Sequence, residues 1–176
     1  MRGRFRFALL GAIAVSVTAA GFTQTNPTGA EIKSMKTADR FIGTWQPVSV
    51  VDQLSNGKTG YPPYGQYPKG YLMYDATGHV SVQLMNPARP TVDLNRASPE
   101  EIQTLAKTFL AYSGTYSVVD QTTVIHRPES SLNPADVGKD QRRQYEFVGD
   151  LLILKVPPVE ENGVIRNRTL TWKRVR

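Results

Sequence analysis

The chain has 176 residues with 21 lysines and arginines, 15 aspartates and glutamates, two histidines and no cysteine, which gives a formal net charge of +6. This length predicts one domain with a core large enough to be stable without disulfide bonds. The lack of cysteine excludes a disulfide scaffold, a zinc finger, a thiol nucleophile and an iron–sulfur site. The two histidines are too few for a histidine-rich metal site, so we predict no metal and no cofactor.

The first 20 residues have the layout of a secretory signal peptide. Arg2, Arg4 and Arg6 precede an uncharged and mostly apolar stretch at 7–20, which ends in small residues. A membrane span would need about 20 strongly apolar residues. We therefore expect residues 1–20 to be a cleaved leader and the protein to be exported, either to the periplasm or out of the cell.

Behind the leader we expect a flexible polar tether at 21–37, one folded domain at 38–176 and no membrane span in the mature protein.

Cleavage of this leader also changes the charge of the chain. Without the three leader arginines, 18 basic and 15 acidic residues remain, so the net charge falls to +3. This excess is too small and too dispersed to predict nucleic-acid binding.

The domain consists of short segments of alternating polarity between turn residues, which is the pattern of β-strands. Short turns between neighbours predict antiparallel hairpins, and eight such strands favour an all-β, up-and-down antiparallel barrel over a sandwich, because closure removes exposed edges. The predicted strands are 43–52, 70–75, 79–85, 112–119, 122–127, 140–148, 151–156 and 168–175.

One helix interrupts the predicted strands. Ser98, Pro99 and Glu101 form an N-terminal capping pattern, and apolar residues then recur at helical spacing from Ile102 to Leu110. The remaining helical positions are polar or charged. We therefore expect this helix on the outside of the barrel or across one end.

Short motifs along the whole domain resemble those of one protein family. Gly43-Thr44-Trp45, with Arg174 on the last strand, resembles the lipocalin signature. Taken in order, the wider set is similar to the bacterial and fungal lipocalin-like domain proteins. The resemblance implies an eight-stranded lipocalin-type barrel with a small apolar or amphipathic ligand inside. The matching stretches are 41–45, 61–65, 68–74, 78–85, 89–90, 111–116, 141–143, 149–154 and 170–175.

Aromatic residues give two further expectations. We expect Trp45 and Arg174 to be structural, with the indole closing one end of the barrel and the guanidinium stacked on it; a ligand contact is the alternative. Five of the eight tyrosines gather between residues 61 and 74. Around the loop at 60–70 these rings either gate the mouth of the barrel or pack against its wall.

Strand periodicity predicts which side chains face the interior. In the strand at 112–119, the face with Tyr112 and Tyr116 should point inward. In His79–Met85 we favour the polar face, with Gln83 and Met85 lining a cavity while the aliphatic face meets the helix. The alternative places the aliphatic face in the core.

Two polar residues on later strands are candidates for contact with a ligand. His126 is a weak candidate for a general base, because a lone strand histidine is more often a satisfied polar group. Arg143 shares a strand face with Tyr145, and an inward Arg143 would indicate a ligand carboxylate, because a buried cation without an anion is costly. The alternative, which we favour, is that Arg142 and Arg143 both reach solvent.

The leading hypothesis is an exported lipocalin-like barrel that binds a small, largely apolar molecule. An isomerase or cyclase on the same barrel is one alternative, and a structural or interaction protein with a filled barrel is another. The predicted ligand-binding residues are Tyr74, Gln83, Met85, Tyr112, Tyr116, His126, Arg143 and Tyr145.

Overall fold

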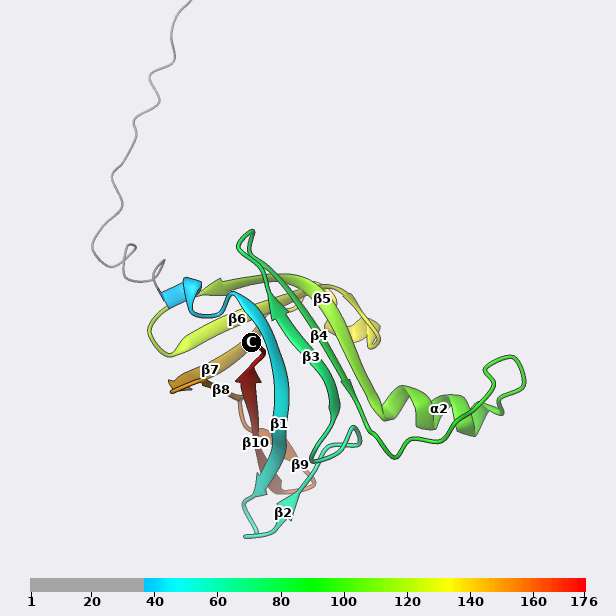
Figure 1. Cartoon of the computed structure of the whole chain (residues 1–176). Coiled ribbons are helices and arrows are strands. Elements are labelled where there is room, and N and C mark those ends of the chain that lie inside the picture. The colour runs from blue at the N-terminus through cyan, green and yellow to red at the C-terminus, as the bar shows by residue number, and fades with distance from the viewer. Residues whose placement is uncertain (1–36) are drawn as a thin grey trace, which may run out of the picture.

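Neighbouring strands pair antiparallel around the whole sheet, and β1 closes it into a barrel by pairing with β10 (Figure 1). The structure is a computed structural model and describes residues 37–176; the expected leader and most of the tether lie outside this range. The predicted eight-stranded antiparallel barrel is confirmed. Its strands are β1 (Gly43–Leu54), β3 (Lys69–Tyr74), β4 (His79–Met85), β5 (Phe109–Val118), β6 (Thr123–Ser131), β7 (Gln141–Val148), β8 (Leu151–Lys155) and β10 (Val164–Arg174).

Three short elements that the sequence did not indicate lie outside the barrel strands. The two-residue β2 (Thr59–Gly60) pairs with β1, and β9 (Val159–Glu161) pairs with β10. A 3₁₀ helix, η1 (Pro134–Asp136), lies between β6 and β7. These elements extend the barrel at its loops without changing its closure.

The helix α2 (Pro99–Lys107) begins as predicted but ends earlier. The Ser98 hydroxyl oxygen accepts a hydrogen bond from the Glu101 backbone N–H, and the Ser98 backbone N–H donates one to the Glu101 carboxylate. Phe109 and Leu110 were expected in the helix, but they belong to β5, where they pair with β4. The helix buries none of its residues and projects from one end of the barrel (Figure 1).

The inner face of β4 is aliphatic. Val80, Val82 and Leu84 are buried in the core, whereas Gln83 and Met85 lie on the outer face and are only half-buried. The favoured prediction for this strand was therefore wrong. That prediction needed the helix to cover the aliphatic face, but α2 points away from the barrel, so only the interior removes these side chains from water.

Aromatic rings close one end of the barrel. Phe41 follows the helical turn at residues 37–39 and is fully buried. Its ring centroid lies 4.8–5.1 Å from those of Tyr74, Tyr145 and Phe147, all with edge-to-face geometry. Tyr116 packs on Tyr74 at 4.8 Å in the same cluster. Beyond this aromatic cluster, the barrel interior contains aliphatic side chains and the cavity.

Trp45 and Arg174 stack at the same end, as predicted. They are register partners on β1 and β10, and the Arg174 guanidinium carbon lies 4.1 Å from the indole centroid. Arg174 also donates to the carbonyl oxygens of Ile42 and Arg40. Gly43 has φ of +131°, and a Cβ there would lie 2.7 Å from Arg174 Nη1, so glycine is needed beside this stack.

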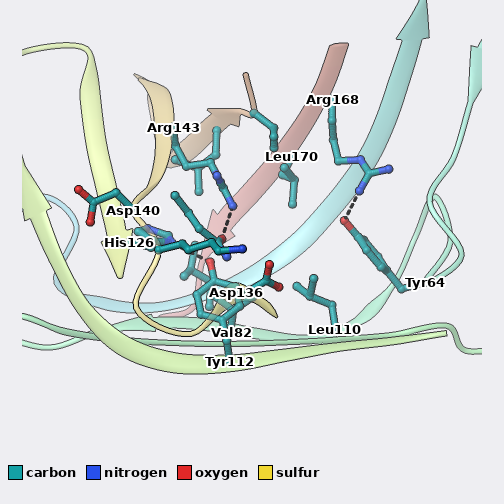
Figure 2. A pocket seen from close by; sticks show the side chains of 15 residues that line it. Tyr64, Val82, Leu110, Tyr112, His126, Asp136, Asp140, Arg143, Arg168 and Leu170 are labelled. Atoms are coloured by element: carbon teal, nitrogen blue, oxygen red, sulfur yellow. Dashed lines mark hydrogen bonds between the residues drawn. The ribbon is translucent and has the colours of Figure 1, made fainter. Parts of the chain in front are cut away.

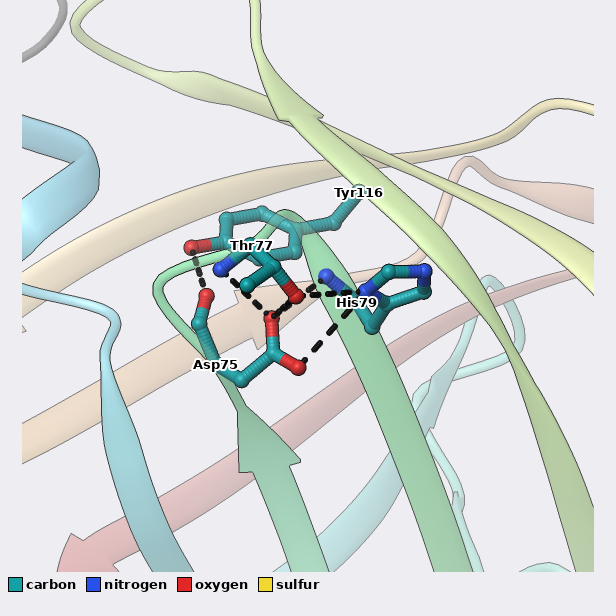
Figure 3. A network of polar contacts seen from close by, with 4 residues as sticks. All are labelled: Asp75, Thr77, His79 and Tyr116. Atoms are coloured by element: carbon teal, nitrogen blue, oxygen red, sulfur yellow. Dashed lines mark hydrogen bonds and ion pairs between the residues drawn. The ribbon is translucent and has the colours of Figure 1, made fainter.

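The turn between β3 and β4 is held by Asp75 (Figure 3). Its carboxylate accepts hydrogen bonds from the backbone N–H groups of Thr77 at 2.8 Å and His79 at 2.9 Å, which is an Asx turn. The Tyr116 hydroxyl donates to the Asp75 carbonyl at 3.1 Å. This bond ties β5 to the turn and occupies the hydroxyl of Tyr116 away from the cavity.

Candidate functional site

A cavity of about 390 Å³ lies inside the barrel (Figure 2). One part of its wall lies at the far end of β1 from Trp45, where Asp52 pairs with Arg168 of β10. The volume lies within the roughly 300–1,000 Å³ range of small-molecule sites. The lining residues are Tyr64, Leu72, Val82, Leu110, Tyr112, His126, Asp136, Lys139, Asp140, Gln141, Arg143, Leu154, Val156, Arg168 and Leu170.

The cavity wall has an aliphatic part and a charged part. Leu72, Val82, Leu154 and Leu170 are buried and form the aliphatic part. The segment between β6 and β7, at 132–140, adds three charged residues to the lining: Lys139 and Asp140 are exposed, and Asp136 is half-buried. A molecule with an apolar body and a polar end matches this distribution.

His126 lies at the cavity wall with both ring nitrogens engaged by tyrosine hydroxyls. Tyr74 Oη is 2.7 Å from Nε2, and Tyr112 Oη is 2.7 Å from Nδ1. His126 is 1% exposed, and this burial, with the nearby charge of Arg143, lowers its pKa to about 3. The imidazole is therefore neutral at physiological pH, with one N–H donor and one acceptor nitrogen.

The two tyrosines beside His126 are neutral as well. Burial raises the pKa of Tyr112 to about 12 and raises the pKa of Tyr74 well above its ordinary value. Tyr112 lines the cavity, whereas Tyr74 lies behind His126 in the aromatic cluster. The three side chains thus connect the closed end of the barrel to the cavity by hydrogen bonds.

Arg143 and Arg168 lie on separate parts of the cavity wall in Figure 2, and their partners differ. Arg168 donates to both carboxylate oxygens of Asp52, at 2.7 and 2.8 Å, and to the Tyr64 hydroxyl at 3.1 Å. Arg143 donates to the side chain of Gln141 at 2.7 Å and to the Arg142 carbonyl at 2.9 Å. These two partners are uncharged groups, as is the Tyr112 hydroxyl, which a hydrogen bond also links to Arg143.

The structure places three of the eight predicted ligand-binding residues at the cavity. Tyr112, His126 and Arg143 line it; Arg143 is half-buried, whereas Arg142 is exposed. Tyr74 touches the site only through His126. The remaining predicted residues lie elsewhere: Tyr116 and Tyr145 in the aromatic cluster and Gln83 and Met85 on the outer face.

Arg168 is a cavity residue that was not predicted from the sequence, and Tyr64 was considered only as one of five tyrosines that either gate the mouth or pack against the wall. Of the loop tyrosines, Tyr64 is buried against Arg168, whereas Tyr61 and Tyr67 are exposed. A signal for Arg168 was present, because it shares a strand face with the apolar Leu170. The position of Tyr64 carried no such signal, because its loop has no strand periodicity.

Among residues 37–176, no cluster of three or more His, Cys, Asp or Glu side chains is arranged to hold a metal ion. The helices within this range include none that is both long and apolar enough to cross a membrane.

A closed eight-stranded antiparallel barrel around a partly polar cavity belongs to the class of small ligand-binding barrels. The family model for the lipocalin-like domain matches residues 42–175, and the chain belongs to this family. A relative, the 4'-hydroxy-3'-methoxypropiophenone carrier protein of Aspergillus oryzae, is 31% identical over 107 residues, which cover 54% of this chain and 96% of the relative. Both findings support ligand binding in general.

Proposed function

We propose that this protein is an exported carrier that binds a small, largely apolar aromatic molecule in the barrel cavity. The observation that carries the proposal is the cavity of about 390 Å³, with aliphatic and aromatic walls and a few polar groups. Burial of a ligand against these walls stabilises the complex by roughly 25 cal/mol per Å² of apolar surface. The polar groups then set the orientation of the ligand.

The relative supports an aromatic ligand with oxygen substituents. Its name identifies a carried molecule with one aromatic ring, a ketone, a hydroxyl and a methoxy group. Tyr64 and Tyr112 offer aromatic rings and hydroxyls at the cavity, and Leu72 and Leu154 offer apolar contacts. These side chains suit a ligand of the same general chemistry.

The arrangement favours a carrier over the two alternatives. A structural barrel with a filled core does not account for a cavity of this volume. An isomerase or cyclase needs a group that exchanges a proton with the substrate. Both ring nitrogens of His126 are already engaged by Tyr74 and Tyr112, so the imidazole has no nitrogen ready to contact a substrate.

Export is supported by the sequence alone, through the three leading arginines and the uncharged stretch at 7–20. The test is expression in a bacterial host followed by fractionation and intact-mass measurement. We expect a processed chain in the exported fraction that starts close to Gly21. A full-length chain that stays with the cytosol would contradict export without affecting the ligand-binding proposal.

Ligand binding is tested by calorimetric titration of the folded protein with 4'-hydroxy-3'-methoxypropiophenone. The variant Leu110→Trp places a large ring at the cavity wall, and Leu94→Trp makes the same change at a side chain that is 67% exposed and outside the cavity. We expect Leu110→Trp to weaken binding about tenfold or more and Leu94→Trp to leave it unchanged. Equal affinity in all three proteins would place the ligand outside this cavity.

A further inference from the structure

We propose that the Tyr112 hydroxyl and the Arg143 guanidinium form one subsite for an ionised oxygen of the ligand, either a carboxylate or an acidic phenol on an aromatic molecule. The inference rests on the proposed ligand-binding function and names the chemical class of the ligand. Tyr112 lies on β5 and Arg143 on β7, with His126 on β6 between them, so three neighbouring strands present these groups to the cavity.

The hydrogen bonds around His126 fix the direction in which Tyr112 donates. Tyr74 is 3% exposed. Within the described residues, the Tyr74 hydroxyl has its hydrogen bond with His126 Nε2. If Tyr74 accepted a proton from Nε2, its own O–H would be buried without an acceptor, which is costly. Tyr74 therefore donates to Nε2.

The tautomer of His126 follows from that donation. A neutral imidazole that accepts at Nε2 carries its proton on Nδ1, and this N–H donates to Tyr112 Oη at 2.7 Å. The O–H of Tyr112 is then left to donate to another group. Because Tyr112 lines the cavity, the ligand is the group placed to accept this proton.

The charges around the cavity leave a cation without a matching anion. Arg168 is neutralised by Asp52, and Asp140 is bound by Arg127 at 2.7 Å. Asp136 and Lys139 also line the cavity and form no ion pair with each other among the described residues; the Asp136 carboxylate balances one of the two remaining cations, Lys139 and Arg143, and it raises the pKa of Tyr112. Arg143 takes part in no ion pair among the described residues, although five N–H donors are present on a guanidinium.

The charge of Arg143 acts on the groups that line the interior. It lowers the pKa of Tyr112, Tyr74 and Tyr64 against the larger effect of burial, and it lowers the pKa of His126. A partly buried cation of this kind is stabilised by an anion at hydrogen-bond distance. An ionised ligand oxygen beside Tyr112 would supply that anion.

The test uses two matched pairs of probes and measures the affinity ratio within each pair by calorimetry. One pair is 3-phenylpropanoate and its amide. The other is 4'-hydroxy-3'-methoxypropiophenone, in a buffer that ionises its phenol, and the 4'-O-methyl ether. The proteins are the wild type, Arg143→Gln, Tyr112→Phe and the control Arg142→Gln, which changes an exposed arginine on the same strand.

We expect the wild type to prefer the anion in at least one pair by about tenfold or more, as for a hydrogen bond to a charged group. Arg143→Gln should bring that ratio close to one, Tyr112→Phe should lower it severalfold, and Arg142→Gln should match the wild type. The pair that responds identifies the ligand oxygen as a carboxylate or a phenolate.

Three outcomes would overturn the subsite. If the wild type binds the neutral and the anionic member of each pair with equal affinity, the subsite is overturned and the ligand-binding proposal is left intact. A preference that survives in Arg143→Gln would do the same. Failure of all four probes to bind the wild type would overturn both the inference and the proposal of an aromatic ligand.

A second measurement does not depend on the folding of Arg143→Gln. In ¹⁵N-histidine NMR of the wild type, we expect His126 as the Nδ1–H tautomer, with Nε2 in its unprotonated state. The Nε2–H tautomer would reverse the donation of Tyr112 and overturn the subsite. Arg143→Lys keeps the positive charge without the planar guanidinium, and it should retain part of the preference for the anion.

Discussion

Asp52 and Arg168 face each other across β1 and β10, and the guanidinium binds both carboxylate oxygens at 2.7 and 2.8 Å. The side chains are 5% and 17% exposed, so water screens the pair only weakly. Tyr64 adds a third hydrogen bond to the same guanidinium. The pair therefore joins the first and last barrel strands at the cavity.

Removal of one member of this pair should be costly. We expect Asp52→Asn to lower the free energy of unfolding by about 3 kcal/mol, because Arg168 would remain buried without its anion. The matched control is Asp140→Asn, whose exposed pair with Arg127 should contribute less than about 1 kcal/mol. Urea unfolding measures both variants, and equal effects would show that burial does not set the strength of the Asp52 pair.

Burial of His126 predicts a loss of stability in mild acid. Its pKa is about 3 in the folded state and about 6.5 in the unfolded chain, so between these values the unfolded chain binds a proton that the folded chain excludes. Stability is complete above about pH 6.5 and falls as pH decreases towards 3, by up to about 1.4 kcal/mol per pH unit. The lowered pKa values of Asp75 and Asp120 matter only below about pH 4.

Urea unfolding at a series of pH values between about 4.5 and 7 isolates this effect from that of the carboxylates. His126→Gln should flatten the dependence on pH in that window, and His79→Gln, at an exposed position, should leave it as in the wild type. A steep dependence that persists in His126→Gln would assign the proton uptake to another group.

Gly114 is required by a close approach of two strands. The β5–β6 register shifts at this residue, and a Cβ there would lie 2.1 Å from the carbonyl oxygen of Arg127. We expect Gly114→Ala to destabilise the barrel by about 1–3 kcal/mol or to prevent folding. Gly60→Ala is the control, because its Cβ would have only ordinary contacts at 3.8 Å or more. Thermal unfolding compares the two variants.

The capping box of α2 should affect the helix without affecting the barrel. Ser98→Ala removes a bond to the Glu101 backbone and should weaken the helix by about 1 kcal/mol. Because α2 buries none of its residues, we expect faster hydrogen exchange at Pro99–Lys107 and an unchanged unfolding temperature. A matching drop in the stability of the barrel would mean that helix and barrel unfold together.

Strand periodicity was sufficient to predict the barrel because alternation has a direct physical cause. In His79–Met85 the predicted bounds agree with the structure, yet the face was misassigned. Alternation of polarity identifies the two faces of a strand. It does not tell which face points into the barrel, because a helix outside the barrel could also bury the apolar face. Here the decision depended on the direction of α2, which its local sequence does not contain.

The cavity was predictable only in part for a related reason. Tyr112 and His126 lie on strands, where side chains alternate between the two faces, so one inward residue predicts that the residues two positions away also point inward. Tyr64 reaches the cavity from a loop, where no such rule applies. The end of the helix was also missed, since cross-strand pairing of Phe109 with Met85 overrides helical spacing.

The aromatic closure around Phe41 bears on how fast a bound molecule exchanges. The rings fill one end of the barrel, and the segment at 132–140 contributes charged side chains to the cavity wall. If the proposed ligand enters past this segment, contacts with these side chains add to the barrier for its release and lengthen its residence time.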